Sequence, residues 1–343
     1  MARSSGLVSP RERRRQRPAS DVRLPHVVTI GGGTGHFAAL TGLRTLGVRL
    51  TAIVTMMDSG GSSGRLRDEY GILPPGDFTR CLVALSRHPH AMKELLTHRF
   101  LGGSLDGHTV RNVVFAALEQ ITGDTVSTIE RLHEVFDVDG SVLPVTLDRV
   151  DLVMDLANGR CYRGEATIDG LADMLEAPVH SVRLDPMAEA FAPALDAIAD
   201  ADLVLIGPGD LFTSIVPNLL VRGVAEALRD TAAPIVYVCN LMTKPNETPN
   251  FTVSDFVAAI DGRLGGRELD AVLYNRVWPS HRLDLYASAG SAPVGTAALA
   301  DQPWADRCVG RDLLSEGRYI RHDPLKLAAA VADLAAERGW FCV

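Results

Sequence analysis

Short apolar runs alternate with amphipathic segments along most of the chain, and this alternation predicts an α/β fold. Five runs have the length of a buried strand and are bounded by glycine or polar residues: 27–30, 50–57, 201–206, 234–239 and 269–275. Segments with helical spacing separate them; Leu40, Leu43 and Leu46, for example, share one helical face. Buried strands that alternate with helices are typical of a mostly parallel sheet.

Residues 125–170 follow a different pattern, which predicts a small antiparallel insertion. Three segments there alternate or are rich in β-forming residues, with Asp-Gly and Asn-Gly turns between them: 142–147, 149–156 and 160–168. We place this insertion at about residues 137–170, within a single α/β domain of residues 25–343.

The first apolar run enters a glycine cluster, Gly31 to Gly35 with Thr34 inside it, and a helical segment follows. Glycine lets a backbone approach a ligand closely, and the free N–H groups of a helix N-terminus suit phosphate. Neither standard nucleotide pattern is met, because His36 stands at the third glycine of the dinucleotide motif and no P-loop lysine follows. A tight strand–helix turn without a ligand is the plain alternative for this cluster taken alone.

Polar residues follow the second apolar run, where α/β sheets place ligand-binding groups. Asp58 ends the run, and a loop with Ser62, Ser63 and Arg65 comes next, which suits a phosphate or diphosphate. Asp77 follows a Pro-Pro-Gly turn, where it can be a helix N-cap, a metal or substrate ligand, or both.

Two further loops carry candidate ligand-binding residues. His108 and Asn112 lie four apart at the entrance of a predicted helix, so they share a face, and both a structural and a ligand-binding role stay open for His108. A second strand–glycine–hydroxyl turn runs from Gly207 to Ser214. Two such turns at the carboxyl ends of strands indicate a ligand site far more specifically than either alone.

Composition and charge narrow the function classes. The chain has 343 residues, 46% hydrophobic and 22% charged, with a net charge of −8, which disfavours a general nucleic-acid binder. No apolar run approaches the roughly 20 residues that cross a bilayer. The five cysteines are scattered, which disfavours zinc and disulfide frameworks and fits a cytoplasmic protein. Residues 1–24 are basic and predict a disordered tail, solvated rather than bound to RNA or lipid.

Six motifs in the chain resemble one family: IGGGTG, TMMDSGGSSGRLRDEYGILPPGD, GHTVRN, IGPGDLFTSIVPNLL, NLMTKPNET and RHDP. Together they resemble the 2-phospho-L-lactate transferase (CofD-like) superfamily, and within it the gluconeogenesis-factor (YvcK-type) branch. The resemblance runs from about Val27 to the C-terminus. It implies a Rossmann-like three-layer α/β sandwich with a mostly parallel sheet.

The resemblance also implies roles for individual residues. Asp58 and Asp77 match family aspartates and would be catalytic and bind Mg²⁺ in a transferase, whereas Ser59 and Arg111 replace a second aspartate and a glycine. Motif matches and residue chemistry together give this ligand-binding set: Gly32, Gly33, Thr34, Gly35, Ser62, Ser63, Arg65, His108, Asn112, Gly207, Gly209, Thr213, Ser214, Asn240, Met242, Thr243, Asn275, Tyr286 and Arg321.

These motifs and residues are compatible with three functions. The leading hypothesis is a regulatory protein that binds a UDP-sugar such as UDP-N-acetylglucosamine, linked to carbon metabolism and cell shape. The alternative is a Mg²⁺-dependent transferase that moves 2-phospholactate from a GDP-activated donor onto a deazaflavin precursor; the third is a scaffold with a vestigial pocket. No NAD, haem or zinc is expected, nor a specific nucleic-acid partner, and a homodimer is common for folds of this size.

Overall fold

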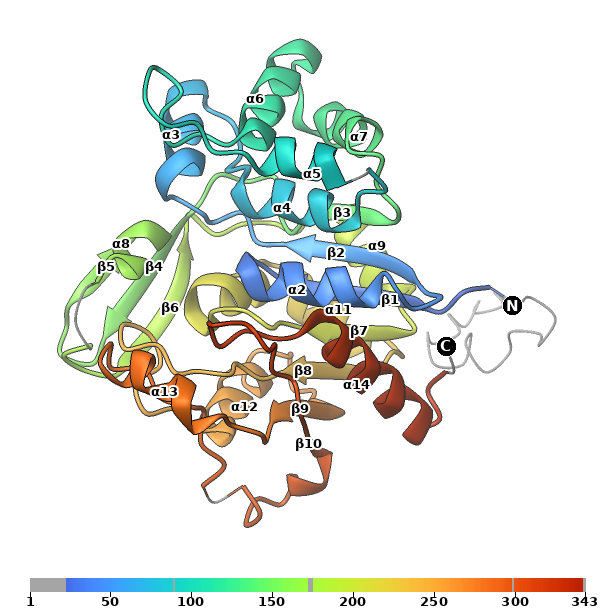
Figure 1. The fold of residues 1–343 in the computed structure, drawn as a ribbon, viewed down its shortest axis with the longest axis vertical. Helices are drawn as coiled ribbons and strands as arrows, with labels where there is room; N and C mark the ends of the chain where they lie inside the picture. Colours follow the sequence, from blue (N-terminus) through green and yellow to red (C-terminus); the bar gives the residue numbers. More distant parts are fainter. Residues whose placement is uncertain (1–22, 89, 172–174, 298, 342–343) are drawn as a thin grey trace, which may run out of the picture.

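In a computed structural model, residues 23–88, 90–171, 175–297 and 299–341 are described. Within them, seven parallel strands form the central sheet in the order β10-β9-β8-β7-β1-β2-β3 (Figure 1). The strands are β1 (His26–Gly31), β2 (Arg49–Val54), β3 (Ser141–Pro144), β7 (Leu203–Ile206), β8 (Ile235–Val238), β9 (Ala271–Asn275) and β10 (Cys308–Arg311). The strand order runs outward in opposite directions from β1 and β7, so the topological switch point lies between these two strands.

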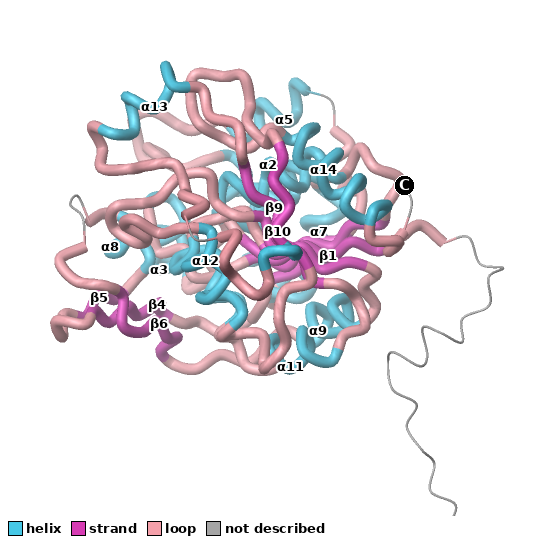
Figure 2. The backbone as a smooth tube through the Cα atoms, turned by 90° about the horizontal axis from the view of Figure 1, so that it is seen from below, coloured by secondary structure: helices cyan, strands magenta, loops and turns pink. Residues whose placement is uncertain are grey.

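Helices cover both faces of this sheet. Figure 2 shows α2 and α14 on one side of the strands and α9, α11 and α12 on the other. The helices are α2 (Gly33–Leu43), α3 (Gly61–Tyr70), α4 (Gly76–Leu85), α5 (His90–Thr97), α6 (Val110–Thr122), α7 (Thr125–Val135), α8 (Glu165–Asp169), α9 (Ala192–Ala199), α10 (Val216–Leu219), α11 (Val224–Asp230), α12 (Val253–Asp261), α13 (Ser280–Ala287) and α14 (Pro324–Glu337). The predicted three-layer α/β sandwich with a parallel sheet is confirmed.

The core explains why the strands read as continuous apolar runs. All six residues of β1 are buried, and so are all four of β7. A parallel strand between two helical layers has no solvated face, so its sequence shows no alternation. No helix of the described residues has both the length and the apolar character to cross a bilayer.

The antiparallel insertion lies later in the chain than the sequence predicts. Its strands are β4 (Asp151–Leu156), β5 (Cys161–Arg163) and β6 (Val179–Asp185), in the order β5-β4-β6. β3 instead pairs in parallel with β2 at the edge of the main sheet. Burial alternates along this edge strand, a pattern that is also typical of antiparallel strands with one exposed face, and this explains the wrong prediction. Residues 165–169 form α8 rather than the end of a strand. Figure 1 shows this sheet and α8 beyond the carboxyl ends of the parallel strands.

A segment that the sequence predicts as a loop is helical. The Gly-Ser stretch after Asp58 forms α3, which begins after Gly60 and ends at Gly71 in the left-handed conformation. Residues 1–22 of the predicted disordered tail lie outside the described residues.

Candidate functional site

The two glycine turns meet at the switch point between β1 and β7. A Cβ on Gly35 would stand 2.6 Å from the Pro208 carbonyl oxygen, and one on Gly209 would stand 3.2 Å from the Gly32 oxygen. Gly33 has a φ of +71°, which few other residues adopt. Side chains are thus excluded from the contact between the turns, which explains the glycines in both.

A cleft of about 540 Å³ opens beside the first turn, and we call it the acidic cleft. It is lined by Gly33, Thr34, Asp58, Gly60, Asp77, Arg80, Glu165, Ala166, Asp169, Gly170, Asp210 and Ser214. Five of these described residues are acidic, and they come from the loop after β2, from α4, from α8 and from the loop after β7. Arg80 is the one basic side chain among the described lining residues.

Asp77 connects the first glycine turn to α4. The Gly33 amide donates a hydrogen bond of 2.8 Å to Asp77 Oδ2, and Arg80 Nη1 lies 3.5 Å from Asp77 Oδ1. Burial raises the pKa of Asp77 to about 6; Arg80 opposes this shift and Asp58 adds to it. The N-cap of α4 is Pro75, so Asp77 is not the cap residue that one interpretation of the sequence made it.

Ser59 joins the loop after β2 to α8, whereas Asp58 makes a hydrogen bond within the loop. The Gly60 amide donates to Asp58 Oδ1 at 2.9 Å, and the Ala166 amide donates to Ser59 Oγ at 2.9 Å. Ser59, which replaces an aspartate of the family pattern, therefore fastens α8 at the edge of the acidic cleft. Burial raises the pKa of the adjacent Glu165 to about 8, and Asp58 and Asp169 add to the shift.

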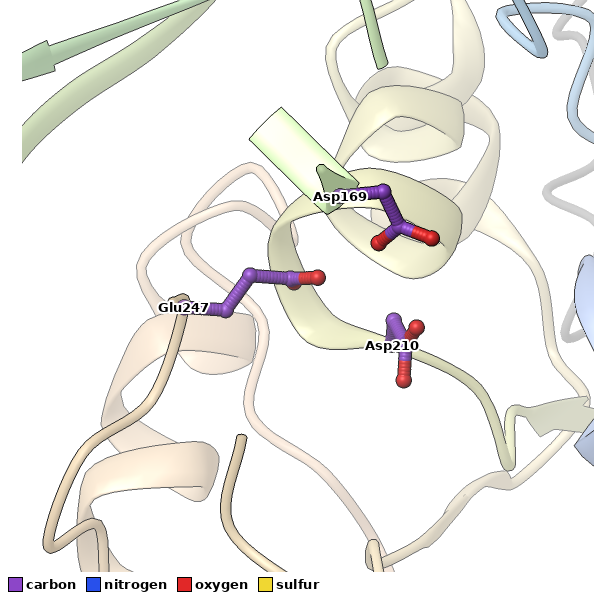
Figure 3. A group of neighbouring side chains, drawn as sticks. All are labelled: Asp169, Asp210 and Glu247. Carbon is purple, nitrogen blue, oxygen red and sulfur yellow. The ribbon is translucent and has the colours of Figure 1, made fainter. Parts of the chain in front are cut away.

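Three carboxyl groups at the border of this cleft face one another in Figure 3: Asp169 on α8, Asp210 after β7 and Glu247 after β8. One oxygen of each lies within 4.8 Å of the others, a spacing that could suit a metal ion. Lys244 provides a positive charge here instead. Its Nζ donates to Asp210 Oδ2 and Glu247 Oε1 at 2.7 Å each, and also to Asp169.

The charge pairing sets the ionisation of this cluster. Burial lowers the pKa of Lys244, but Glu247 and Asp210 outweigh burial and raise it above its usual value. Glu247 is fully buried, and it also accepts hydrogen bonds of 3.0 Å from the Phe212 amide and from Thr213 Oγ1. Glu247 and Lys244 thereby hold the second glycine turn, which continues as a short π-helix, Leu211–Ile215.

A second cleft of about 440 Å³ adjoins the first, and we call it the aromatic cleft. It is lined by Thr34, Gly35, Phe37, Ala38, Gly209, Asp210, Asn240, Leu241, Met242, Tyr286, Ser315, Ile320, Arg321, His322 and Pro324. The Ile320 amide donates to the Tyr286 hydroxyl at 2.8 Å, and the Arg321 guanidinium lies 5.5 Å from the Tyr319 ring centroid. The two clefts share Thr34 and Asp210, so they form one continuous site over the switch point.

Some of the predicted site residues line these clefts and the others lie outside them. The acidic cleft contains Gly33, Thr34, Asp58, Asp77 and Ser214, and the aromatic cleft contains Thr34, Gly35, Gly209, Asn240, Met242, Tyr286 and Arg321. The remaining ten line neither cleft: Gly32, Ser62, Ser63, Arg65, His108, Asn112, Gly207, Thr213, Thr243 and Asn275.

Three of those ten form a buried network between helices. His108 Nδ1 lies 3.0 Å from Ser62 Oγ, which also accepts from Asn112 Nδ2 at 3.1 Å. Thr79 Oγ1 donates to Asn112 Oδ1 at 2.9 Å. These bonds connect α3, α4 and the start of α6, so the polar groups of all three residues serve the packing of helices.

Other predicted residues outside the clefts also contact groups of the protein itself. Arg65 donates to the Asp106 carbonyl oxygen, away from both clefts. Thr243 Oγ1 accepts from the Ala292 amide at 3.0 Å, and Asn275 Oδ1 accepts from the Leu313 amide at 2.9 Å. Ser63 Oγ lies 2.3 Å from where a Cβ of Gly76 would stand, so it packs under the start of α4.

Sequence reasoning missed Arg80, Glu165, Asp169, Asp210 and Lys244. Asp210 and Lys244 stand inside the quoted motifs IGPGDLF and NLMTKPNET, and those motifs were the available signal for them. No local pattern indicates Glu165 or Asp169, because their place depends on how α8 docks against the main sheet.

Comparisons with known proteins agree with this fold. Residues 27–304 match the family model described as 2-phospho-L-lactate transferase CofD. A putative gluconeogenesis factor from Nostoc sp. is 43% identical over 311 residues, which cover 89% of this chain and 68% of that protein. The gluconeogenesis factor of Bacillus subtilis is 37% identical over 317 residues, 91% of this chain and 99% of the relative. A crystal structure of a Bacillus halodurans protein, 36% identical, aligns with a TM-score of 0.85 over 90% of this chain and 99% of its own.

Proposed function

Because the chain belongs to the 2-phospho-L-lactate transferase (CofD) family and has close relatives named gluconeogenesis factors, we propose that it is a regulatory protein that binds a UDP-sugar. UDP-N-acetylglucosamine is the representative ligand. The observation that carries the proposal is the junction of an aromatic and an acidic cleft at Thr34 and Asp210, over the switch point of the sheet. This is where α/β sheets bind nucleotides.

Each part of a UDP-sugar has a chemical counterpart in the combined site. The aromatic cleft offers the Tyr286 ring and the exposed Arg321 guanidinium to a base and ribose. Gly32, the N-cap of α2, has no side chain that could cap the helix, and Asp77 takes only the Gly33 amide, which leaves the amides of Thr34 and Gly35 for a diphosphate. Carboxylates of the acidic cleft accept hydrogen bonds from sugar hydroxyls. Arg80, rather than Arg65, supplies positive charge there.

The regulatory part of the proposal comes from the relatives. Two of them carry the name gluconeogenesis factor. We therefore propose that ligand binding regulates carbon metabolism; the link to cell shape and wall maintenance comes from the family resemblance of the sequence motifs. A cytoplasmic site of action fits this role, since nucleotide-sugars are made there.

Thermal denaturation tests the proposal directly. The protein is melted with UDP-N-acetylglucosamine, GDP or GTP, each with Mg²⁺ and with EDTA. The proposed function predicts a rise in melting temperature with the UDP-sugar in both conditions. Arg321→Ala should abolish this rise in melting temperature. Arg318 also stacks on Tyr319 but does not line the cleft, so Arg318→Ala should keep the rise.

The acidic cleft favours a second candidate function, a Mg²⁺-dependent transferase of the 2-phospho-L-lactate type. Mg²⁺ prefers carboxylate oxygens, and Asp58, Asp77 and Asp210 offer them from three different segments. The ion would neutralise the charge of a bound diphosphate, while the glycine turns position it. A Mg²⁺-dependent shift with GDP or GTP that Asp58→Asn abolishes would support this function, and no shift with any nucleotide would contradict both.

A further inference from the structure

A third cavity, of about 450 Å³, is lined by residues of α3 and of all three strands of the small antiparallel sheet. Three arginines and three aspartates are among its described lining residues: Arg67, Arg149, Arg163, Asp68, Asp151 and Asp185. We call it the arginine cavity. None of its lining residues lines the acidic or the aromatic cleft, so it is a separate site.

Two of the arginines pair with the three aspartates. Arg67 Nε donates to Asp68 Oδ1 at 3.0 Å, and Arg67 Nη1 donates to Asp151 Oδ1 at 3.3 Å. Arg163 Nη1 donates to Asp151 Oδ2 at 3.1 Å, and Arg163 Nη2 donates to Asp185. Each of the three aspartates therefore already has a guanidinium partner.

Arg149, the third arginine, has no such partner. It is exposed, lines the cavity and makes no hydrogen bond or ion pair with another described residue. Its guanidinium nevertheless has a defined place, because Nη1 and Nη2 both lie 3.1 Å from where a Cβ of Gly71 would stand. Gly71 ends α3, and the C-terminus of a helix favours a cation. The guanidinium is thus positioned, and its N–H groups are left to bind an anion.

Apolar side chains also line the arginine cavity. Met56, Pro74 and Val150 are buried and belong to this lining. Binding sites for small molecules combine apolar surface with a few placed polar groups. The cavity therefore fits a ligand that has both a charged group and an apolar body.

We propose that the arginine cavity binds a small organic monocarboxylate, with its carboxylate on Arg149 and its apolar body against Met56 and Val150. A guanidinium can bind a carboxylate through two parallel N–H···O bonds. A dianion, such as a phosphate monoester, is disfavoured because three aspartates line the same cavity and like charges repel. The site lies outside both clefts, so this inference does not depend on the proposed nucleotide-sugar binding.

Titration of the full chain with simple carboxylates, followed by NMR, tests the proposal. Phenylacetate and 4-methylpentanoate provide an aromatic and an aliphatic body, and each is compared with its neutral amide. For ligands of this size we expect a dissociation constant of about 1 mM for at least one acid, and binding at least about tenfold weaker for its amide, for acetate and for phenyl phosphate. Equal binding of acid and amide, or no binding of either acid at about 10 mM, overturns the inference.

Arg149→Gln removes the proposed anion partner. Its affinity for the acid should fall about tenfold, to that of the amide. Arg160→Gln is the matched control, since Arg160 is an exposed arginine in the turn between β4 and β5 and does not line the cavity. Urea denaturation should show near wild-type stability for both variants, because both side chains are exposed. Equal affinity of Arg149→Gln and wild type overturns the inference.

The position of the bound acid provides a test that needs no variant. Nuclear Overhauser effects should connect the protons of the apolar body to the methyl groups of Met56 and Val150. A bound acid that shows these effects only to other residues, such as Tyr286 of the aromatic cleft, overturns the inference.

Discussion

The Gly33 amide donates a 2.8 Å hydrogen bond to Asp77 Oδ2, and this bond joins the first glycine turn to the first turn of α4. A Cβ on the preceding Gly32 would stand 2.6 Å from the same oxygen, so the turn and the carboxyl group fit together closely. Asp77 therefore shapes the glycine turn and also presents its second oxygen to Arg80 and the acidic cleft.

Removal of the Asp77 carboxyl group should destabilise the fold. Asp77→Ala leaves the Gly33 amide without its acceptor, and we expect a loss of about 1–3 kcal/mol in the free energy of unfolding. Asp77→Asn keeps an acceptor and should lose less. Urea denaturation measures both, with the exposed Asp68→Ala as a control near wild type. An Asn variant less stable than the Ala variant would contradict this account.

Stability should fall as pH rises, because of Glu165. Its pKa in the folded protein is about 8, above the usual 4.5, so the folded state binds this proton more tightly than the unfolded state. The stabilisation is complete below about pH 4.5 and is lost as pH rises through 8, with a slope of up to about 1.4 kcal/mol per pH unit. Asp77, whose pKa is raised to about 6, adds a smaller loss of stability as pH rises to about 6.

Glu165→Gln isolates this effect, since the amide does not titrate. Denaturation in EDTA between pH 5 and 9 should show a steep decline for the wild type and a much flatter profile above about pH 7 for the variant, because Asp77 and Glu247, whose pKa values are raised to about 6 and to about 7, also lose protons below that pH. Parallel profiles would show that Glu165 ionises normally in the folded protein.

Lys244 should stabilise the fold by neutralising the carboxyl cluster of Asp169, Asp210 and Glu247. Lys244→Gln leaves Glu247 buried without its cation, and loss of one partner of a buried ion pair costs about 3–5 kcal/mol. Oxygen atoms this close can then hold Ca²⁺, so Ca²⁺ should raise the melting temperature of the variant. The wild type should not respond to Ca²⁺ at this cluster.

Lys326→Gln is a matched control for Lys244→Gln. Its partner Asp312 is 44% exposed and Lys326 is 37% exposed, so the loss should stay below about 1 kcal/mol. If Lys244→Gln is no less stable than this control, Lys244 does not neutralise the cluster.

Asn112 should matter for stability and not for ligand affinity. Asn112→Ala removes the bonds to Ser62 and Thr79 in the interior, at a cost of about 1–3 kcal/mol in unfolding free energy. Because Asn112 lines neither cleft, its variant should bind UDP-N-acetylglucosamine as the wild type does. Weaker binding with unchanged stability would contradict this prediction and would indicate that Asn112 contacts the ligand.

From the sequence, residues far apart in the chain could be predicted to lie close together only where they follow strands of the same parallel sheet. Gly33, Asp58 and Ser214 follow strands whose carboxyl ends share one edge of a parallel sheet, so their proximity follows from the fold class. Ser62 was predicted to face a ligand because Gly and Ser favour loops, but tertiary packing makes this stretch helical and turns the hydroxyl inward. Glu165 could not be predicted, because its place depends on the docking of α8 through Ser59.

Calorimetric titration of UDP-N-acetylglucosamine tests the central claim most directly, that the aromatic and acidic clefts together bind a UDP-sugar. In EDTA, the wild type and Arg318→Ala should bind one equivalent with similar affinity, and Arg321→Ala should bind at least about tenfold more weakly. UDP alone should bind more weakly than the UDP-sugar, since it leaves the carboxyl groups of the acidic cleft without sugar hydroxyls. No binding to the wild type, or equal affinity of Arg321→Ala and wild type, would contradict the claim.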